Sequence, residues 1–366
     1  MTYTIFFGLI AVLLAYLARY KFFKIGLELS FFVLTIFMGI RYDWGNDYPA
    51  YLKMFYKNTL TNDFSKDYFV DIFTDENSEF GWKILNMLFK DFGFFAMVFV
   101  LTSLEYYILY KAIKRYVSPK WYWLAVFLFT FNSGFMLTGC SMMRQYLSMS
   151  IVVMAIKYII NGNGWKYSAC IFLASTIHTS ALIMLPIYFI RLLPSLYSQK
   201  AIFGAVLGSL FYFMLASLIA AEFLPVFLEF GNFERYETYL ETESVTASIG
   251  LGVMYYCGIF FVALRSGKYV EHSMYVIAVL SSLYILFVPF VTVAPLVGRV
   301  GYYFSYLSVL SFPVMFEKMY GKWWINVFLV VTIVFTLYLF FTFFYSEIWY
   351  DSMFEYKSIF SAPMWM

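Results

Sequence analysis

Apolar runs long enough to form membrane-spanning helices recur from one end of the chain to the other, separated by short polar segments. The runs are Thr2–Ala18, Ile25–Ile40, Phe92–Tyr110, Trp121–Leu137, Tyr146–Ile160, Lys166–Arg191, Ala201–Ala221, Ile249–Leu264, Ser273–Ala294, Val300–Phe316 and Ile325–Phe344. A helix that crosses a bilayer needs about 20 predominantly apolar residues. The pattern therefore predicts an all-α, polytopic integral membrane protein, with one transmembrane domain covering residues 1–366.

The run Lys166–Arg191 is unusual because His178 interrupts its middle. A single straight helix over this length would rise roughly 36 Å and could cross a bilayer with tilt. Two helices of half that length would rise roughly 18 Å each, which is too short for two full crossings. The run is therefore either one span, a pair of short spans, or a re-entrant or broken-helix hairpin around His178.

The distribution of charge decides between these arrangements. If the run enters and leaves on the same side, one group of loops is almost entirely basic and contains two acidic residues, Glu271 and Glu317. Its basic residues are Arg19, Lys21, Lys24, Lys111, Lys114, Arg115, Lys120, Lys157, Lys166, Arg191, Lys200, Arg265, Lys268, Lys318 and Lys322. Short basic loops face the cytoplasm. We therefore predict about ten full spans plus the hairpin, with both termini outside.

Two long outer loops follow from this topology, residues 41–91 and 222–248. Both are rich in acidic and aromatic residues. Tyr48, Tyr51 and Phe55 recur at helical spacing in the first loop, which predicts a short helix there. Aromatic residues make up 24% of the chain. Many of them are expected to anchor helices at the membrane interface, so the count alone does not indicate a ligand.

Arginine residues at the outer ends of predicted spans are the first candidates for a binding site. Arg41 ends the second span, Arg144 opens the fifth and Arg299 opens the ninth, each among polar and glycine neighbours. Arg235 lies in the second outer loop. Arginine at a span end can extend to lipid phosphates. Because the guanidinium group also binds phosphate with two parallel hydrogen bonds, we predict an anion site formed by the three span-end arginines.

His178 and three outer acidic residues are the candidates for proton transfer. An isolated histidine in an apolar stretch often has only a structural hydrogen bond, but a neutral imidazole can also accept a proton. His178 is our first choice as a general base, and Asp43 or Asp47 is the second. Glu79 is a third outer acid that can orient a substrate hydroxyl. The alternative for all three acids is helix capping and solvation.

Motifs for several other kinds of chemistry are absent from the sequence. It contains no H-E-x-x-H, no D-x-D, no paired histidines and no phosphate-binding P-loop. We therefore predict no metal, no cofactor and no nucleic-acid partner. Cys140, Cys170 and Cys257 form no C-x-x-C motif and are expected to be small side chains packed within helices.

Five short motifs, taken together and in this order, resemble the EpsG/Wzy family of polysaccharide polymerases. They are R-Y-D-W-G-N-D-Y at Arg41–Tyr48, G-C-S-M-M-R-Q at Gly139–Gln145, A-S-T-I-H-T-S-A at Ala174–Ala181, E-R-Y at Glu234–Tyr236 and G-R-V-G-Y-Y-F at Gly298–Phe304. The segment E-Y-K-S-I-F at Glu355–Phe360 resembles the family's N-P-Y-x-x-I/F tail but does not match it at every position.

The resemblance implies a glycosyltransferase that joins oligosaccharide repeat units carried on undecaprenyl diphosphate, at the outer face of a bacterial cytoplasmic membrane. In such a reaction we expect Arg41, Arg144 and Arg299 to hold the diphosphate, and His178, or else Asp43 or Asp47, to activate the acceptor hydroxyl. The residues expected to bind substrate are Asp47, Glu79, Gln145, Arg235, Tyr236 and Tyr302. Membrane lipid, a chain-length regulator and a flippase are the further partners implied.

Three other functions fit the same residues. A transporter of lipid-linked oligosaccharide or polysaccharide would use the arginines and aromatics without breaking a bond. An acyltransferase could use His178 as its base, although the sequence contains no feature for handling an acyl donor. A structural scaffold of an export complex would leave the outer arginines without a role.

Overall fold

The computed structural model describes the whole chain except residues 61–78, 197, 231–249, 294 and 362–366. The described residues form α-helices and 3₁₀ helices and no β-strand, with one antiparallel bridge between Arg41 and Ser358. The predicted all-helical fold is confirmed. Contacts divide the chain into two compact units, residues 1–188 with 321–366, and residues 189–320. The prediction of one transmembrane domain is not tested by this division.

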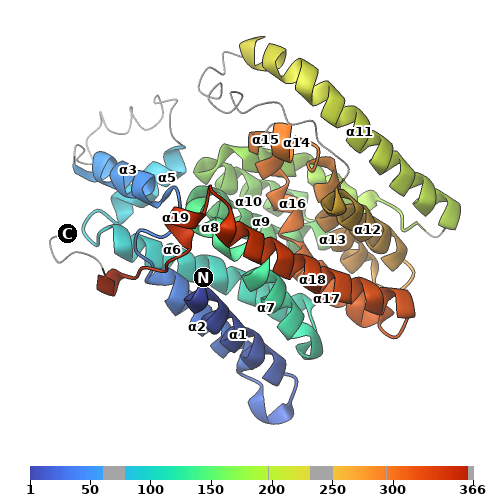
Figure 1. The fold of residues 1–366 in the computed structure, drawn as a ribbon, viewed down its shortest axis with the longest axis horizontal. Helices are drawn as coiled ribbons and strands as arrows, with labels where there is room; N and C mark the ends of the chain where they lie inside the picture. Colours follow the sequence, from blue (N-terminus) through green and yellow to red (C-terminus); the bar gives the residue numbers. More distant parts are fainter. Residues whose placement is uncertain (61–78, 197, 231–249, 294, 362–366) are drawn as a thin grey trace. The chain divides into compact units, whose positions relative to one another are not determined.

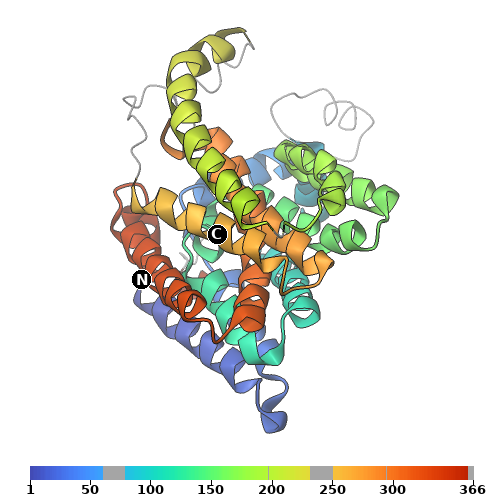
Figure 2. The same ribbon diagram turned by 90° about the vertical axis from the view of Figure 1, so that its right-hand side faces the viewer.

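The first unit is built around helix pairs. Its elements are α1 (Thr2–Leu17), η1 (Lys21–Phe23), α2 (Gly26–Gly39), α3 (Tyr48–Leu60), α5 (Phe80–Leu88), α6 (Phe94–Tyr116), η2 (Pro119–Trp121), α7 (Tyr122–Phe131), α8 (Met136–Ser141), α9 (Met143–Ile160), α10 (Gly164–Ile177), the first part of η3 (Thr179–Leu192), α18 (Trp323–Tyr345), α19 (Tyr350–Met353) and η6 (Ile359–Ser361). Figures 1 and 2 show α1 and α2 as an antiparallel pair, in blue. α2 packs on α6, which in turn packs on α9.

Two long helices of this unit differ in how much of their surface the protein covers. Of the 18-residue apolar segment that could span a membrane, 72% is buried in α9 and 28% is buried in α18. α9 contacts α6, α8 and α10, and its polar residues Gln145, Ser148 and Ser150 are buried with the apolar ones. Because α18 is apolar on all sides, its exposed surface suits lipid. α9 is therefore the central helix of the first unit, and α18 is peripheral.

The second unit has its own core. Its elements are the remainder of η3, α11 (Gln199–Phe230), α12 (Leu251–Ser266), α13 (His272–Ser282), η5 (Leu283–Leu286), α14 (Phe290–Val293), α15 (Pro295–Val300), α16 (Tyr302–Ser305) and α17 (Ser308–Met319). One cluster of buried residues joins α11, α12 and α13 through Ile202, Leu264, Tyr275 and Val279. α17 packs on both α12 and α13.

Four helices in the described residues are long and apolar enough to cross a membrane: α6, α9, α18 and residues Gln199–Ala216 of α11. Several predicted runs are shorter or interrupted in the structure. The run Trp121–Leu137 is divided between α7 and α8, and the run Ser273–Ala294 between α13, η5 and α14. The helices support a membrane protein, while the number of about ten full spans stays a prediction.

The chain leaves helical geometry at His178, as the sequence predicts. α10 ends at Ile177, His178 has an extended backbone (φ −150°, ψ 112°), and η3 follows as a 3₁₀ helix. The Thr176 hydroxyl donates to the carbonyl of Leu173 (2.8 Å), returning a hydrogen bond to the backbone near the break. The broken helix is therefore confirmed, whereas re-entry into the membrane stays a prediction.

The structure describes only part of the two loops that were predicted to lie outside. The predicted helix of the first loop is confirmed as α3, and α5 follows later in the same loop. Residues 61–78 between them lie outside the described residues. The second loop was predicted to begin after Ala221, but α11 continues to Phe230. The rest of that loop also lies outside the described residues. Cys140 and Cys257 are buried and Cys170 is half-buried.

The turn between α2 and α3, residues 40–47, is referred to as the Arg41 corner. Asp43 (φ 45°) and Gly45 (φ 124°) both have left-handed backbone conformations there, which glycine adopts without steric cost. The corner pairs with residues 348–359, the C-terminal strap. The hydrogen bonds between the two segments include Tyr42 N–H to Lys357 O (3.0 Å), Trp44 Nε1 to Met353 O (2.9 Å), Asn46 Nδ2 to Ile348 O (2.8 Å) and Ile359 N–H to Ile40 O (2.9 Å). The strap thereby holds the entry into α3.

Candidate functional site

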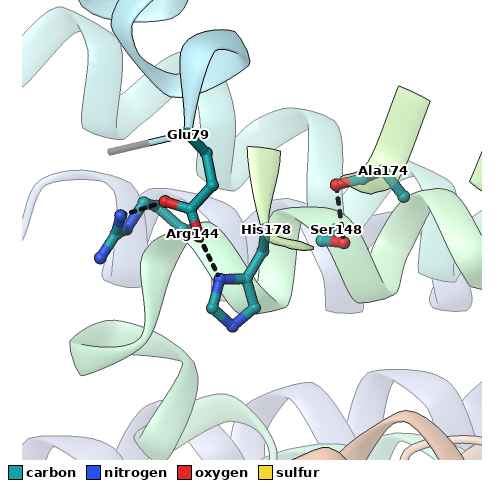
Figure 3. Close-up of polar contacts among 5 residues, drawn as sticks. All are labelled: Glu79, Arg144, Ser148, Ala174 and His178. Carbon is teal, nitrogen blue, oxygen red and sulfur yellow. Dashed lines mark hydrogen bonds and ion pairs between the residues drawn. The ribbon is translucent and has the colours of Figure 1, made fainter. Parts of the chain in front are cut away.

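A carboxylate, a guanidinium group and an imidazole meet where three helices of the first unit begin or end. Glu79 precedes α5, Arg144 lies in the first turn of α9, and His178 follows α10. Arg144 Nη1 donates to Glu79 Oε2, and His178 Nδ1 lies 3.0 Å from Glu79 Oε1. Figure 3 shows the carboxylate between the two partners, with the second ring nitrogen of His178 directed away from it.

Helix α9 places Arg144 next to the end of α10. Ser148 lies one helical turn after Arg144 on the same face of α9. Its hydroxyl donates to the carbonyl of Ala174 in the last turn of α10 (3.1 Å; Figure 3). The same carbonyl accepts the backbone N–H of His178 (3.0 Å). The two helices are thus joined by a hydrogen bond one turn from the site.

Glycine at position 81 permits the approach of α5 to α10. A Cβ atom on Gly81 would lie 2.4 Å from Thr176 Oγ1 and 2.7 Å from the carbonyl oxygen of Thr176. Both distances are far shorter than a van der Waals contact. Since Glu79 is two residues before Gly81 and His178 is two residues after Thr176, the absence of a side chain at position 81 lets the carboxylate reach the imidazole.

Tyr51 of α3 supports Arg144 from another direction. The guanidinium carbon of Arg144 lies 5.7 Å from the centroid of the Tyr51 ring, a cation–π distance. The Tyr51 ring packs edge-on against Trp82 of α5, with centroids 5.4 Å apart. Burial raises the pKa of Tyr51, only partly offset by the positive charge of Arg144. The Tyr51 hydroxyl therefore stays protonated at neutral pH.

The charge state of Glu79 determines the proton positions in this group. Burial favours the neutral acid, but the hydrogen bond with His178 and the charge of Arg144 outweigh it and lower the pKa of Glu79 to about 2. An ionised carboxylate only accepts hydrogen bonds, so Nδ1 of His178 must carry the proton that it donates. In neutral His178 this leaves Nε2 as a proton acceptor. The side chains of His178, Arg144 and Glu79 are 27%, 24% and 16% exposed, so solvent and ligands have access.

Comparison with known families identifies the lineage of the chain. The model of the EpsG family matches residues 24–358, nearly the whole chain. The chain belongs to the EpsG family. Family membership, together with the apolar helices, indicates a polysaccharide polymerase-type membrane protein with glycosyltransferase-like activity. No curated protein and no solved structure matches the chain.

Arg41, in the first motif shared with the EpsG family, has different partners from Arg144. It is 4% exposed, and its Nη1 donates to the carbonyl of Met38 (2.6 Å) and to Thr102 Oγ1 (3.0 Å). Glu105, one turn after Thr102 on α6, interacts with it electrostatically. The described contacts of Arg41 are therefore with the helices that surround the corner.

The remaining predicted residues of the first unit lie around this group. Asp43 forms an ion pair with Lys357 of the strap (Oδ2 to Nζ, 3.0 Å). Asp47 is exposed just before α3, and its carbonyl accepts the backbone N–H of Tyr51. Gln145 is 4% exposed inside the helix bundle. Asp43 and Asp47 therefore have the partners and exposure of loop residues.

The predicted residues of the later EpsG motifs belong to other parts of the chain. Arg299 lies at the end of α15 and Tyr302 at the start of α16, both in the second unit. The Tyr302 ring stacks beside that of Tyr284, with centroids 6.5 Å apart and an interplanar angle of 12°. Arg235 and Tyr236 lie outside the described residues. A single anion site formed by three arginines stays a prediction.

Three residues of the site were not among the sequence candidates: Tyr51, Gly81 and Ser148. Tyr51 was noted only for helical spacing, and its position four residues after Asp47 does not indicate an arginine partner. Gly81 and Ser148 both contact α10. The contact of Gly81 is with a residue nearly a hundred positions later in the chain. Among the described residues, no group of three or more His, Cys, Asp or Glu side chains is placed to hold a metal ion.

Proposed function

We propose that this protein is a polysaccharide polymerase that joins undecaprenyl-diphosphate-linked oligosaccharide repeat units at the outer face of the bacterial cytoplasmic membrane. One observation carries the proposal beyond family membership. A single carboxylate, Glu79, contacts both an arginine suited to phosphate and a histidine suited to proton transfer. Chain extension from a lipid diphosphate needs both functions in one place.

Arg144 acts on the leaving group in this proposal. The bond that breaks joins the anomeric carbon of the growing chain to its lipid diphosphate, which leaves with the electron pair. A guanidinium group beside the diphosphate stabilises the charge that develops on it. Arg144 is suited to this because its Nη1 is held by Glu79 while its side chain remains partly exposed.

His178 acts on the acceptor. The hydroxyl at the non-reducing end of the next lipid-linked unit attacks the anomeric carbon, forms the new glycosidic bond and loses its proton. Nε2 of neutral His178 accepts that proton, because Nδ1 already donates to Glu79. The imidazolium then releases the proton to solvent. The reaction requires no nucleotide, since the energy resides in the sugar–diphosphate bond.

Reconstitution of the purified protein tests the proposal. Cells that carry an inactive variant should accumulate the unpolymerised lipid-linked unit, which can be extracted and supplied to protein in lipid vesicles. We expect a ladder of products that differ by one repeat unit, formed without added nucleotide or metal. Transfer of the unit across the vesicle membrane without a ladder would support a transporter and contradict the proposal.

A further inference from the structure

We propose that Glu79 is a positioning residue that fixes the proton of His178 on Nδ1 and at the same time holds Arg144, so that one carboxylate aligns the proton acceptor with the diphosphate-binding cation. This inference rests on the proposed function. It assigns to Glu79 a role other than substrate binding. The geometry supports it because each carboxylate oxygen already has its own partner, Oε1 with His178 and Oε2 with Arg144.

Glu79 is also not used as a helix cap. It occupies the residue before α5, where acidic side chains commonly accept hydrogen bonds from the first turn. Its backbone has the extended conformation of such a residue (φ −66°, ψ 128°), yet its side chain makes no capping hydrogen bond. The carboxylate is instead turned toward Arg144 and His178 (Figure 3). The side chain of Glu79 therefore does not cap α5 and instead connects the start of α9 with the end of α10.

A carboxylate is required because both partners are donors. Arg144 always donates, and His178 donates from Nδ1 only if the opposite atom is an acceptor. A glutamine at position 79 has one acceptor oxygen and one NH₂ group. If its oxygen accepts from Arg144, its NH₂ group faces Nδ1, which must then accept, and the proton of neutral His178 moves to Nε2. If its oxygen accepts from His178, its NH₂ group faces the Arg144 donor.

Either arrangement of glutamine harms one of the two functions. In the first, Nε2 carries a proton and cannot take one from the acceptor hydroxyl. In the second, Arg144 loses its hydrogen-bond acceptor and its fixed orientation. The substitution also removes a negative charge next to the anionic leaving group. The loss of this repulsion favours binding of the diphosphate. We therefore expect Glu79→Gln to lower kcat while KM for the lipid-linked unit does not rise.

The test uses the vesicle assay with the extracted lipid-linked unit and three variants, Glu79→Gln, His178→Gln and the double variant. Glu347→Gln is the matched control, since it makes the same chemical change at an exposed carboxylate of the same unit. Glu79→Asp is included because it keeps two acceptor oxygens on a shorter side chain. Folding is checked for each variant by its yield in membranes and its thermal midpoint in detergent.

Glu79→Gln should lower kcat about 10²–10⁴-fold, the cost expected when a base carries its proton on the wrong nitrogen. Glu79→Asp should recover part of that loss, and Glu347→Gln should match the wild type. Once His178 is replaced, the oxygen of a glutamine at position 79 can stay with Arg144, so only the loss through His178 remains. Adding Glu79→Gln to His178→Gln should therefore lower kcat less than about threefold further, the sign of two residues acting as one unit.

The outcomes separate this inference from the proposed function. If the wild type makes no ladder, the proposed function fails before Glu79 is tested. If the wild type polymerises but Glu79→Gln has an unchanged kcat, Glu79 is not a positioning residue. Multiplicative losses in the double variant would show that Glu79 acts independently of His178. A raised KM with unchanged kcat would show that Glu79 binds substrate directly, and would overturn the inference.

Discussion

The Arg41 corner and the group of Glu79, Arg144 and His178 lie in the same unit, and each contains an arginine at the end of a helix. The guanidinium group of Arg41 donates to a backbone carbonyl and a hydroxyl and interacts electrostatically with Glu105, in surroundings that leave it 4% exposed. The charge of Arg144 is satisfied by a carboxylate that is shared with a histidine, and its side chain is 24% exposed. The two arginines are equivalent in sequence context but differ in their partners.

From this difference we propose that Arg41 has an architectural role and that Arg144 has a chemical one. We propose that Arg41, which is buried and donates to a carbonyl and a hydroxyl of the surrounding helices, holds the turn in place. An arginine shared with an exposed histidine can still offer donors to an anion. The exposure and the kind of acceptor therefore separate the two roles better than position along the span. The following substitutions test that separation.

His178→Gln should have the largest effect on polymerisation. Glutamine keeps some hydrogen bonding but cannot take a proton at neutral pH. Turnover in a single round of chain extension should fall about 10²–10⁴-fold, the usual contribution of general acid–base catalysis. His272→Gln is the matched control, because His272 is exposed and its Nε2 contacts the carbonyl of Arg191. A His178→Gln protein within about threefold of the wild type would remove His178 from the role of base.

Gly81→Ala should move Glu79 away from His178 without removing any side chain of the site. The new Cβ cannot lie 2.4 Å from Thr176 Oγ1, so α5 must move away from α10. A displacement of about 1 Å at a reacting group can cost ~10²-fold in rate. Gly204→Ala in α11 is the control, since no atom lies within 4 Å of its Cβ position. Wild-type turnover in Gly81→Ala would mean that the close approach of α5 and α10 is not needed.

Arg144→Lys and Arg41→Lys should fail in opposite ways. Lysine keeps the charge but loses the planar group of donors. Arg144→Lys should lower polymerisation per folded molecule about 10- to 100-fold, as expected from the loss of a hydrogen bond to a charged group worth ~1.5–3 kcal/mol. Arg41→Lys should instead lower the thermal midpoint and the yield in membranes, while the folded fraction keeps its activity. If Arg144→Lys and Arg41→Lys lose activity equally and have the same thermal midpoint, the two arginines do not have different roles.

The dependence of stability on pH should show the smallest effect. The pKa of Glu79 in the folded protein is about 2, below its ordinary value of 4.5. Its contacts therefore stabilise the fold at pH values above 4.5, and this contribution is lost as the pH falls toward 2. The difference in thermal midpoint between the wild type and Glu79→Gln should persist down to about pH 4.5 and should narrow as the pH falls from there toward 2. A difference that disappears between pH 8 and pH 6 would assign the effect to another group.

Much of the fold follows from local patterns in the sequence. The apolar runs predicted most helices, and the helical spacing of Tyr48, Tyr51 and Phe55 predicted α3. The break at His178 followed from the charge of the flanking loops, which favoured a hairpin over a single span between Lys166 and Arg191. The interruption between α7 and α8 was not predicted, although the residues between them, Asn132, Ser133 and Gly134, are typical of turns.

The site was predicted as a set of candidates but not as an arrangement. Glu79, Arg144 and His178 were all named from residue type and position near an outer boundary. Their contact depends on the packing of α5 against α10, across 99 residues between Glu79 and His178, and no local pattern encodes such a contact. The burial of Arg41 depends in the same way on Thr102 of α6, which lies in an ordinary apolar run.

The pairing of the C-terminal strap with the Arg41 corner has a consequence for the order of folding during synthesis. Trp44 donates its hydrogen bond to Met353, which is 309 residues later in the chain. α1, α2 and α3 therefore leave the ribosome long before the segment that completes their connecting turn. Contacts so far apart in sequence form only after the intervening loop-closure cost has been met. The corner should thus remain open to solvent and proteases until residues 348–359 have been synthesised and have paired with it.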